Sequence, residues 1–236
     1  FMLVQGGVLA LFSTVLIFLL VVYVESTRIE IPLAHSSVRG ARGKFPVKLI
    51  YASVLPMILV RALQANIQLI GIVLSSRGIT ILGEYVGSTP VNGIMYYLAP
   101  INSPYDWIPS LVTATFTSYG VPAPATWQIA LHVLVDAIFL IAGGIVFALF
   151  WIETTGMGAK PTARKIFNSG MQIPGFRRNI GSIEKVMLRY IPKVTVIGGA
   201  FIGALTLVAS LLGTLGGAGG TGLLLAVSIV YRLYED

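Results

Sequence analysis

The chain has 236 residues, of which 56% are hydrophobic and only 11% charged, and its mean hydropathy is +0.86. Soluble domains carry about 25% charged residues, so this composition excludes an ordinary soluble protein and indicates an integral membrane protein. The absence of cysteine excludes disulfides and thiolate metal sites. The formal net charge of +7 is compatible with nucleic acid as a partner, but the basic residues stand between apolar stretches, which favours a role in membrane topology.

Five apolar stretches approach the length of about 20 residues that a helix needs to cross a bilayer. We predict transmembrane spans over residues 1–24, 46–76, 126–153, 193–213 and 221–236. The last is short and truncated, and the Gly-rich stretch 214–220 before it predicts a tight external turn. Pro56 permits a kink in the second span. Because Phe1 already lies inside an apolar run with no basic flank, we expect no signal peptide and a true start elsewhere.

The loops between these spans differ in charge, which predicts their side of the membrane. Residues 25–45, with the start of the next span, hold Arg28, Arg39, Arg42, Lys44 and Lys48 against Glu25 and Glu30. Residues 154–192, with the start of the next span, hold Lys160, Arg164, Lys165, Arg177, Arg178, Lys185, Arg189 and Lys193 against Glu184. Residues 77–125 hold one basic residue, Arg77. The positive-inside rule places the two basic loops in the cytoplasm and the third loop outside a multi-pass protein of the cell membrane.

The two basic loops also contain local structure. In the first, "RIEIPLAH" at 28–35 alternates apolar and polar residues and "VRGARGKFPVKL" follows, which predicts a ribbon of two short strands. In the second, residues 156–170 predict a short amphipathic helix with its basic residues outward. Residues 180–192 predict another short helix, capped by Ser182 and stopped by Pro192.

Three ionisable residues fall inside the predicted spans. His132 and Asp136 lie four residues apart and so share a helical face. They form either a proton relay or half of a metal site, or else a polar pair that faces another helix or the outer interface. We favour the polar pair, because the only other histidine, His35, lies in a loop and no second histidine–carboxylate motif completes a metal site. Arg61, near the middle of the second span, either lines an aqueous path or is compensated by Asp136 or a buried hydrogen bond.

Other features of the spans carry no catalytic chemistry. On the second span Leu55, Ala62 and Asn66 share one face and Ile58 lies beside it, so aliphatic residues precede an amide that is suited to interhelical hydrogen bonding. Gly199 and Gly203 have the spacing of closely packed helices. The sequence contains no Walker loop, HExxH or GxSxG motif. We therefore predict no enzyme activity, no cofactor and no metal.

Several motifs together resemble the archaeal SecY family, the pore subunit of the general protein-translocation channel, which is related to the eukaryotic Sec alpha subunit. They are "RIEIPLAH…VRGARGKFPVKLIY", "LPMIL", "ANIQL", "FWIETTGMGAK", "MQIPGFRRNIGSIEKVMLRYIPKVTVIGGAFIGAL" and "GGTGLLLAVSIVYRLYED", in the family's order and over essentially the whole chain. The resemblance implies an all-α membrane protein of ten spans in two five-span halves, which close like a clamshell around a pore. This chain would supply spans six to ten and a cytoplasmic β-ribbon. It ends at Asp236, short of the family's cytoplasmic tail.

The resemblance also implies roles for particular residues. The central hydrophobic ring would receive Leu55, Ile58 and Leu225. The second and third spans would line the lateral gate, where Asn66 matches the polar gate residue. The tips of the basic loops would dock the ribosome or, in bacteria, a motor ATPase, through Arg39, Arg42, Arg177 and Arg178. Arg61, His132 and Asp136 match no family motif and stay unassigned.

Partners follow from the same resemblance. They are a single-span SecE-like subunit, a Secβ- or SecG-like subunit, the ribosome with its RNA and proteins, signal sequences and nascent chains, the missing N-terminal half, and the lipid bilayer. Two other classes stay open. One is half of an inverted-repeat secondary transporter that uses Arg61, His132 and Asp136 at a substrate or proton site. The other, a membrane scaffold without a pore, leaves the aliphatic ring and the basic loops unexplained.

Overall fold

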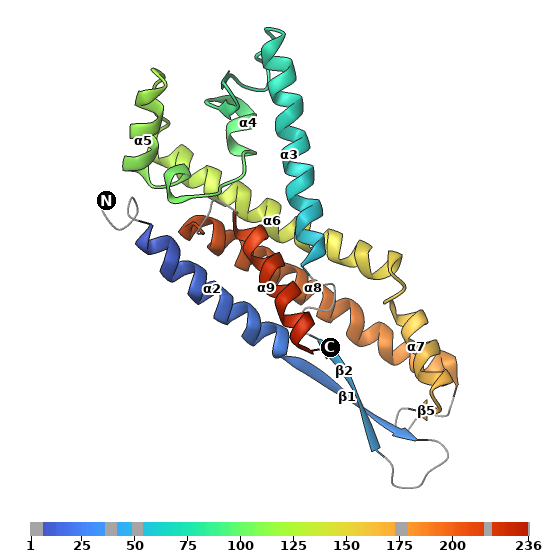
Figure 1. Cartoon of the computed structure of the whole chain (residues 1–236). Helices are drawn as coiled ribbons and strands as arrows, with labels where there is room; N and C mark the ends of the chain where they lie inside the picture. The colour runs from blue at the N-terminus through green and yellow to red at the C-terminus, as the bar shows by residue number, and fades with distance from the viewer. Residues whose placement is uncertain (1–6, 36–41, 49–53, 173–178, 215–218, 236) are drawn as a thin grey trace.

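Helices form most of the chain (Figure 1). The computed structural model describes residues 7–35, 42–48, 54–172, 179–214 and 219–235. The helices are α2 (Val8–Ser26), α3 (Leu55–Ser76), α4 (Gly93–Tyr97), the 3-10 helix η1 (Pro104–Asp106), α5 (Pro109–Ser118), α6 (Thr126–Thr154), α7 (Ala159–Asn168), α8 (Ile180–Leu212) and α9 (Gly219–Glu235). The strands are β1 (Arg28–His35), β2 (Arg42–Lys48), β3 (Tyr85–Val86), β4 (Thr89–Pro90) and β5 (Met171–Gln172).

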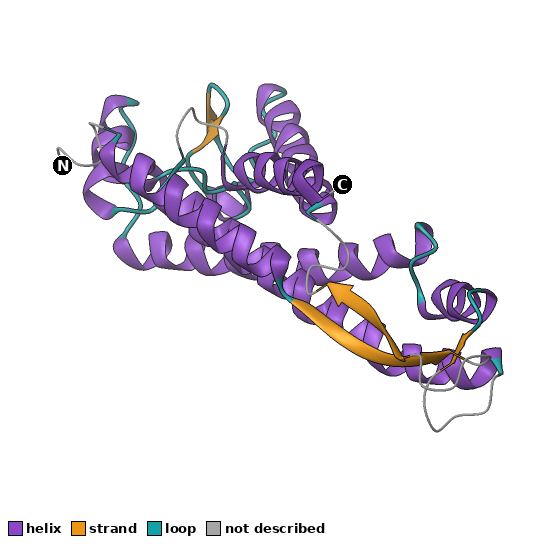
Figure 2. Ribbon diagram, turned by 60° about the horizontal axis from the view of Figure 1, so that its bottom comes forward, coloured by secondary structure: helices purple, strands orange, loops and turns teal. Residues whose placement is uncertain are grey.

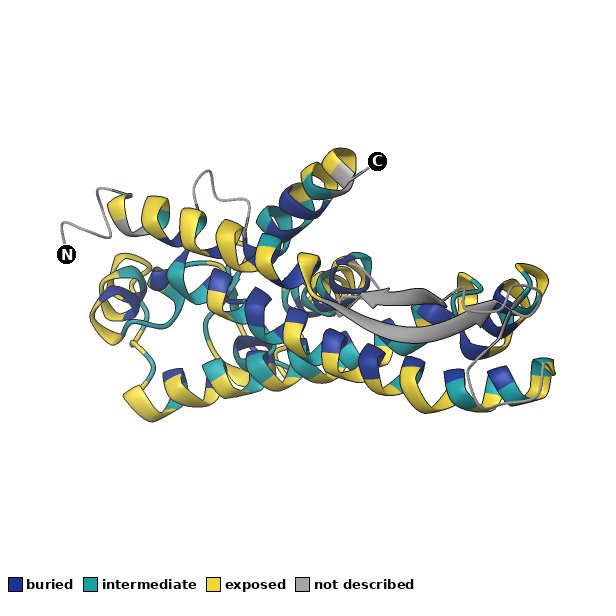
Figure 3. Cartoon of the chain, turned by 90° about the horizontal axis from the view of Figure 1, so that it is seen from below, coloured by how far each residue is buried: buried dark blue, intermediate teal, exposed yellow. Residues whose placement is uncertain are grey.

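Three helices in the described residues, α3, α6 and α8, are long and apolar enough to cross a membrane, and residues 10–26 and 220–231 form shorter apolar helices. Most of this apolar surface is not covered by the chain itself, as Figure 3 shows. Only 28% of the most apolar window of α3 and 22% of that of α6 is buried, against 56% for α8. In water such surface would be unfavourable, so lipid or further protein must cover it.

The centre of the fold is the contact between α6 and α8, which run antiparallel. A Cβ atom on Gly144 would lie 2.6 Å from the carbonyl oxygen of Gly199, and one on Gly203 would lie 2.6 Å from that of Leu140. Glycine at these positions therefore allows the two backbones to touch. This confirms the close packing predicted from Gly199 and Gly203. Around it α2, the start of α3 and α9 complete one apolar cluster.

The second predicted span begins later than expected. Residues 46–48 do not start a helix but complete β2, where Pro46 lies opposite Glu30 of β1. The helix begins at Leu55, so Pro56 lies in its first turn rather than inside the span. A proline is tolerated there because the first turn of a helix has no acceptor for its missing N–H.

The prediction that Pro192 stops a helix is wrong. Residues 180–192 and the next span form the single helix α8, which is capped by the Asn179 side chain rather than by Ser182. Pro192 removes one backbone hydrogen bond, but Ile191 and Val194 on either side of it pack into the same cluster. This packing compensates for the lost bond. At 1.5 Å per residue α8 is about 50 Å long, so it extends well beyond a bilayer core of roughly 30 Å.

The β-ribbon predicted in the first basic loop is present, and it has a third strand. β1 and β2 pair antiparallel, with Arg28 opposite Lys48 and Ala34 opposite Arg42. β5, from the second basic loop, pairs with the end of β1, and the sheet projects from the helices in Figure 2. Because hydrogen-bonded strands cannot lie across a bilayer from one another, both basic loops lie on the same side.

The described parts of the basic loops and residues 77–125, called the outer segment after their predicted side of the membrane, lie at opposite ends of the molecule (Figure 1). The predicted amphipathic helix in the second basic loop is α7, whose buried face packs on the first turns of α8. Residues 77–125, which the sequence analysis treated as one loop, contain the hairpin β3–β4 and the helices α4, η1 and α5. Tyr96, Val112, Phe116 and Ile129 form a small core that fixes this outer segment on the start of α6.

We predict that Gly144→Ala destabilises the protein by about 1–3 kcal/mol, the usual cost of overpacking. The new methyl group would lie 2.6 Å from the Gly199 carbonyl oxygen and would push α6 away from α8. Denaturant titration of the full-length protein in mixed micelles measures this change.

The matched control is Gly181→Ala in the first turn of α8, where the added Cβ atom meets only the Asn179 side chain at 3.8 Å. We expect this variant to be neutral or slightly more stable, because alanine favours a helix more than glycine does. Equal destabilisation of both variants would contradict the close contact.

Candidate functional site

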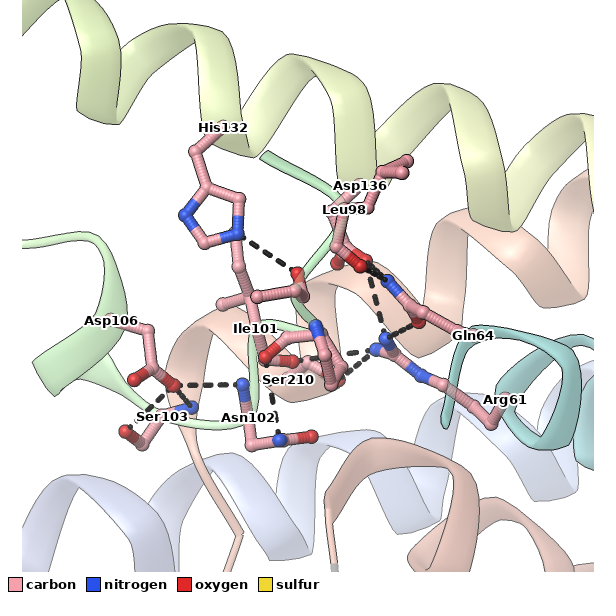
Figure 4. A network of polar contacts seen from close by, with 12 residues as sticks. Arg61, Gln64, Leu98, Ile101, Asn102, Ser103, Asp106, His132, Asp136 and Ser210 are labelled. Carbon is pink, nitrogen blue, oxygen red and sulfur yellow. Dashed lines mark hydrogen bonds and ion pairs between the residues drawn. The ribbon is translucent and has the colours of Figure 1, made fainter. Parts of the chain in front are cut away.

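A polar face of α3 meets the outer segment, α6 and α8 in the middle of an otherwise apolar structure (Figure 4). It consists of Arg61, Gln64 and Gln68, whose spacing of three and four residues places them on one side of the helix. Gln64 is fully buried and the Arg61 side chain is 14% exposed. The glutamines donate to carbonyl oxygens of the outer segment, Gln64 to that of Leu98 at 3.2 Å and Gln68 to that of Met95 at 3.0 Å.

Arg61 contacts three different elements. Its Nη1 atom lies 3.2 Å from Oδ1 of Asp136 on α6 and donates to Oε1 of Gln64 at 2.6 Å. Its Nη2 atom donates to the Ser210 hydroxyl on α8 at 3.1 Å and, at 3.4 Å, to the carbonyl oxygen of Ile101. Of the alternatives left open by the sequence, the ion pair with Asp136 is therefore confirmed. The planar guanidinium of arginine has five N–H donors and can bind several acceptors at once. The ammonium of a lysine could not reach all of these acceptors in the same way.

Asp136 is the most deeply buried charge of this network. Its carboxylate is 0% exposed, and Oδ1 accepts hydrogen bonds from Arg61 and, at 2.9 Å, from Gln64. Oδ2 has no partner among the described residues. Taking a carboxylate out of water costs several kcal/mol, and only a close cation with additional donors offsets this cost. The fold therefore uses Arg61 to neutralise Asp136.

His132 lies one helical turn before Asp136 but belongs to a different group of contacts. Its Nε2 atom lies 2.9 Å from the carbonyl oxygen of Ala99, and its ring lies against that of Tyr96 at 4.7 Å between centroids. Because a carbonyl oxygen can only accept, this contact places a proton on Nε2. Burial, with smaller effects of Tyr97 and Asp106, raises the pKa of Tyr96 to about 12, so this hydroxyl is neutral at physiological pH.

These contacts favour the structural interpretation of His132 and Asp136. The two side chains share no hydrogen bond and bind different carbonyl and amide groups. Among the residues that the structure describes, no cluster of three histidine, aspartate or glutamate side chains could hold a metal. Both residues face other parts of the chain, as expected for the polar pair. His132 contacts Ala99 directly, whereas Asp136 binds Arg61 and Gln64, which donate to Ile101 and Leu98.

Sequence analysis missed further residues of this junction. Trp107 donates its indole N–H to the carbonyl oxygen of Leu211 at 2.8 Å and so links the outer segment to the end of α8. Asp106 accepts from the backbone N–H groups of Asn102 and Ser103, each at 3.0 Å, and closes the turn before Trp107. Ser210, which accepts from Arg61, was also missed. Its position in an apolar span could have indicated it, since serine hydroxyls in such spans commonly form hydrogen bonds between helices.

Both ends of α2 are tied to the C-terminal part of the chain. Ser13 donates to the carbonyl oxygen of Gly213 at 2.6 Å, and Ser228 of α9 donates to the carboxylate of Glu25. Glu25 and Ser228 are 6% and 3% exposed. The sequence analysis counted Glu25 only as a loop charge, because nothing in the sequence connects residues so far apart.

The candidate ring residues Leu55 and Ile58 lie at the start of α3, and Leu225 lies on the neighbouring helix α9. Their neighbours Met57, Val60, Leu224 and Val227 pack in one cluster. Leu55 and Leu225 are half-buried, and Ile58 is 36% exposed. Asn66 is exposed on α3 and has no hydrogen-bond partner in the described part of the chain.

Of the candidate docking arginines, only Arg42 falls within the described backbone, at the start of β2. Arg39, Arg177 and Arg178 lie outside the described residues. The segments that carry them adjoin the paired strands β1 and β5, in which His35 lies opposite Met171. The described strands β1 and β5, which precede these segments in the sequence, therefore belong to one sheet.

Comparison with known proteins identifies the family. The SecY family model matches residues 3–234. The chain belongs to the SecY family. It is 60% identical over 236 residues to the protein translocase subunit SecY of Archaeoglobus fulgidus, covering 100% of this chain but only 48% of that protein. The chain thus spans about half the length of the SecY relatives it matches.

Solved structures show the same architecture. A structure described as a protein-conducting channel matches with a TM-score of 0.76 and 43% identity, over 99% of this chain and 50% of that one. A yeast Ssh1 complex, solved while bound to the 80S ribosome, shares the fold with a TM-score of 0.65 and 22% identity, over 96% of this chain and 44% of that one. The SecY identification does not support the half-transporter hypothesis, and the ion pair gives Arg61 and Asp136 a structural role instead.

We predict that breaking the Arg61–Asp136 pair costs more than removing both charges. Arg61→Met leaves Asp136 buried without a cation, and Asp136→Leu leaves Arg61 unpaired, so each should lose about 3–5 kcal/mol of stability. The double variant should recover a large part of that loss, and denaturant titration of all four proteins measures the coupling. Strict additivity of the two single changes would contradict this role for the pair.

Proposed function

We propose that this chain is the C-terminal half of the pore-forming subunit of a Sec protein translocase. In this function the complete subunit passes secretory polypeptides across the cell membrane and releases membrane segments sideways into the lipid. The observation that carries the proposal is the match of residues 3–234 to the SecY family, together with the likeness to one half of a protein-conducting channel. The subunit is a passive conduit without a cofactor, and the driving force comes from its partners.

The start of α3 and the facing part of α9 supply one side of a pore constriction. We assign Leu55, Ile58 and Leu225 to it, and the Ile58 side chain supports this assignment because 36% of it is left uncovered by the described residues. A ring of aliphatic side chains contacts a passing chain without binding any particular sequence. When idle, it blocks ions because water leaves such a narrow apolar constriction.

Asn66 is assigned to the lateral gate, two turns further along the same helix. Its amide is exposed and unpartnered within the described residues, which suits a contact with the other half of the subunit. That contact satisfies the amide in the closed state. A signal helix that enters between the two halves breaks this contact. The hydrogen bonds of the amide that are lost then set part of the free-energy cost of opening the gate.

The two basic loops form the docking surface for the ribosome on the cytoplasmic side. The pairing of β5 with β1 supports a common surface, and the excess of basic residues in both loops supports the cytoplasm as its location. Arg39, Arg42, Arg177 and Arg178 supply guanidinium groups for ribosomal RNA phosphates. The same surface would serve a motor ATPase in a system that uses one.

The other partners are structural. A SecE-like subunit and a Secβ- or SecG-like subunit accompany the complete pore subunit, and the N-terminal half closes the shell. The low burial of the α3 and α6 windows, 28% and 22%, supports the need for the second half. Signal sequences and nascent chains are the transported partners, and the bilayer covers the remaining apolar surface.

We predict that Arg177→Glu with Arg178→Glu, in the full-length subunit, abolishes most ribosome binding in a co-sedimentation assay. Two carboxylates, which have the same sign of charge as the phosphates of ribosomal RNA, would replace two cations that face them. The remaining binding should weaken further as the salt concentration is raised. Membrane insertion and orientation, measured by protease accessibility, should stay normal.

The matched control is Lys160→Glu with Lys165→Glu on α7, which makes the same charge change at exposed positions of the same loop. It should bind ribosomes much more strongly than the arginine variant. Undiminished binding by the arginine variant would limit Arg177 and Arg178 to topology and reject this docking surface.

A second prediction concerns the ring. Ile58→Ser with Leu225→Ser should raise the ion conductance of the idle channel in planar bilayers, because a polar constriction stays wetted. Phe150→Ser on α6 serves as the comparison, since its side chain is 60% exposed and lies outside the assigned ring. An unchanged conductance in the ring variant would place the constriction elsewhere.

A further inference from the structure

One face of α8 carries cations at one end and aliphatic residues at the other. Arg189, Lys193, Val196 and Ile197 are all exposed, and at about 100° per residue they fall within about 100° of one another around the helix. The opposite side of this part of α8 packs against α7 and the end of α6. Among the described residues, no other element therefore covers this face.

The length of the apolar part of α8 fixes the depth of these cations in the membrane. Residues 194–212 contain no charge and rise about 28 Å at 1.5 Å per residue, close to the roughly 30 Å of a hydrocarbon core. Lys193 therefore lies at the boundary between hydrocarbon and headgroups. Arg189, one turn earlier and about 6 Å further out, lies among the headgroups.

The same boundary carries a shallow apolar groove. Pro192, Lys193, Val196 and Ile197 line this wide-open depression of about 350 Å³. Its exposed lining is entirely apolar, so a hydrocarbon chain suits it better than a polar ligand does. Neither Arg189 nor Lys193 forms an ion pair with any described residue, which leaves both cations available at the rim.

We propose that this face of α8 binds a phospholipid with an anionic headgroup. Arg189 and Lys193 hold the headgroup phosphate, and one hydrocarbon chain lies along Val196 and Ile197. A guanidinium binds phosphate oxygens in pairs and an ammonium adds a point charge, so the two cations complement each other. Ribosomal RNA also offers phosphate, but it has no group for the apolar groove below Lys193, and this favours lipid. The site concerns α8 alone and does not depend on polypeptide transport.

Native mass spectrometry of the full-length subunit in its purified complex tests this site. Phosphatidylglycerol is titrated as the anionic probe and phosphatidylcholine as the neutral one. Arg189→Gln with Lys193→Gln should weaken the tightest phosphatidylglycerol adduct roughly 25-fold, about five-fold for each cation near the membrane surface. Phosphatidylcholine adducts should not change.

Two further variants distinguish a specific lipid site from non-specific attraction of lipid to the positive charge of the protein. Lys160→Gln with Arg164→Gln removes the same charge from exposed positions of α7 and should leave the tightest adduct intact. Arg189→Lys with Lys193→Arg keeps both charges and should retain most of the binding, which also excludes misfolding as the cause of a loss. An equal loss in the α7 variant, or no loss in the α8 variant, overturns the proposal.

The remaining outcomes identify other occupants. Displacement of the adduct by excess inorganic phosphate would show a site that binds phosphate alone, without the hydrocarbon chain. Reduced ribosome binding with unchanged lipid adducts would assign the cations to RNA. Appearance of the adduct only after an accompanying subunit is removed would show that protein covers this face. Each of these results rejects the lipid site, whereas failure of the docking or ring variants described above would leave it untouched.

Discussion

The buried charge of Asp136 is the constraint on which the arrangement of this chain depends. Its carboxylate has no exposure to solvent, and an unpaired charge at that position would cost several kcal/mol. Arg61 from α3, Gln64 one turn further and Ser210 from α8 converge on this point, together with carbonyl groups of the outer segment. The compensation of one charge thus fixes the rotation of α3, its distance from α6 and the path of residues 98–101.

Close packing of α6 on α8 makes this convergence possible. Where Gly144 faces Gly199, the two backbones are in contact, and no side chain larger than hydrogen fits. α3 joins this pair through a smaller apolar contact at Met57 and Val60 and through the polar junction. The result is a pair of helices, α6 and α8, in close backbone contact, and a third helix, α3, held by both apolar packing and hydrogen bonds. α3 can thus be positioned accurately while only 28% of its most apolar window is buried by the chain.

The sequence alone predicted the elements whose cause is local or compositional. Apolar length predicted the long apolar helices, alternation in 28–35 predicted the ribbon, and the spacing of Gly199 and Gly203 predicted close helix packing, although not that α6 is the partner. It did not predict that α8 continues through Pro192, because the apolar cluster that compensates for the lost hydrogen bond comes from distant residues. The links from Trp107 to Leu211 and from Glu25 to Ser228 were missed for the same reason, since each joins segments more than a hundred residues apart. For Arg61 the sequence left two alternatives, and only the geometry of three helices could decide between them.

The two functions assigned to α3 place opposite demands on its two sides. The side with Met57, Arg61, Gln64 and Gln68 must be held, whereas the side with Ile58 and Asn66 must stay available to a passing chain or to the other half of the shell. At about 100° per residue the centres of these two faces lie about 130° apart, so one helix can meet both demands at once. The Asn66 amide on the free face would be poorly placed against lipid alone, because hydrocarbon offers it no hydrogen bond. The free face therefore favours a protein or water-filled boundary over lipid, as the proposed seam between two halves of a channel would provide.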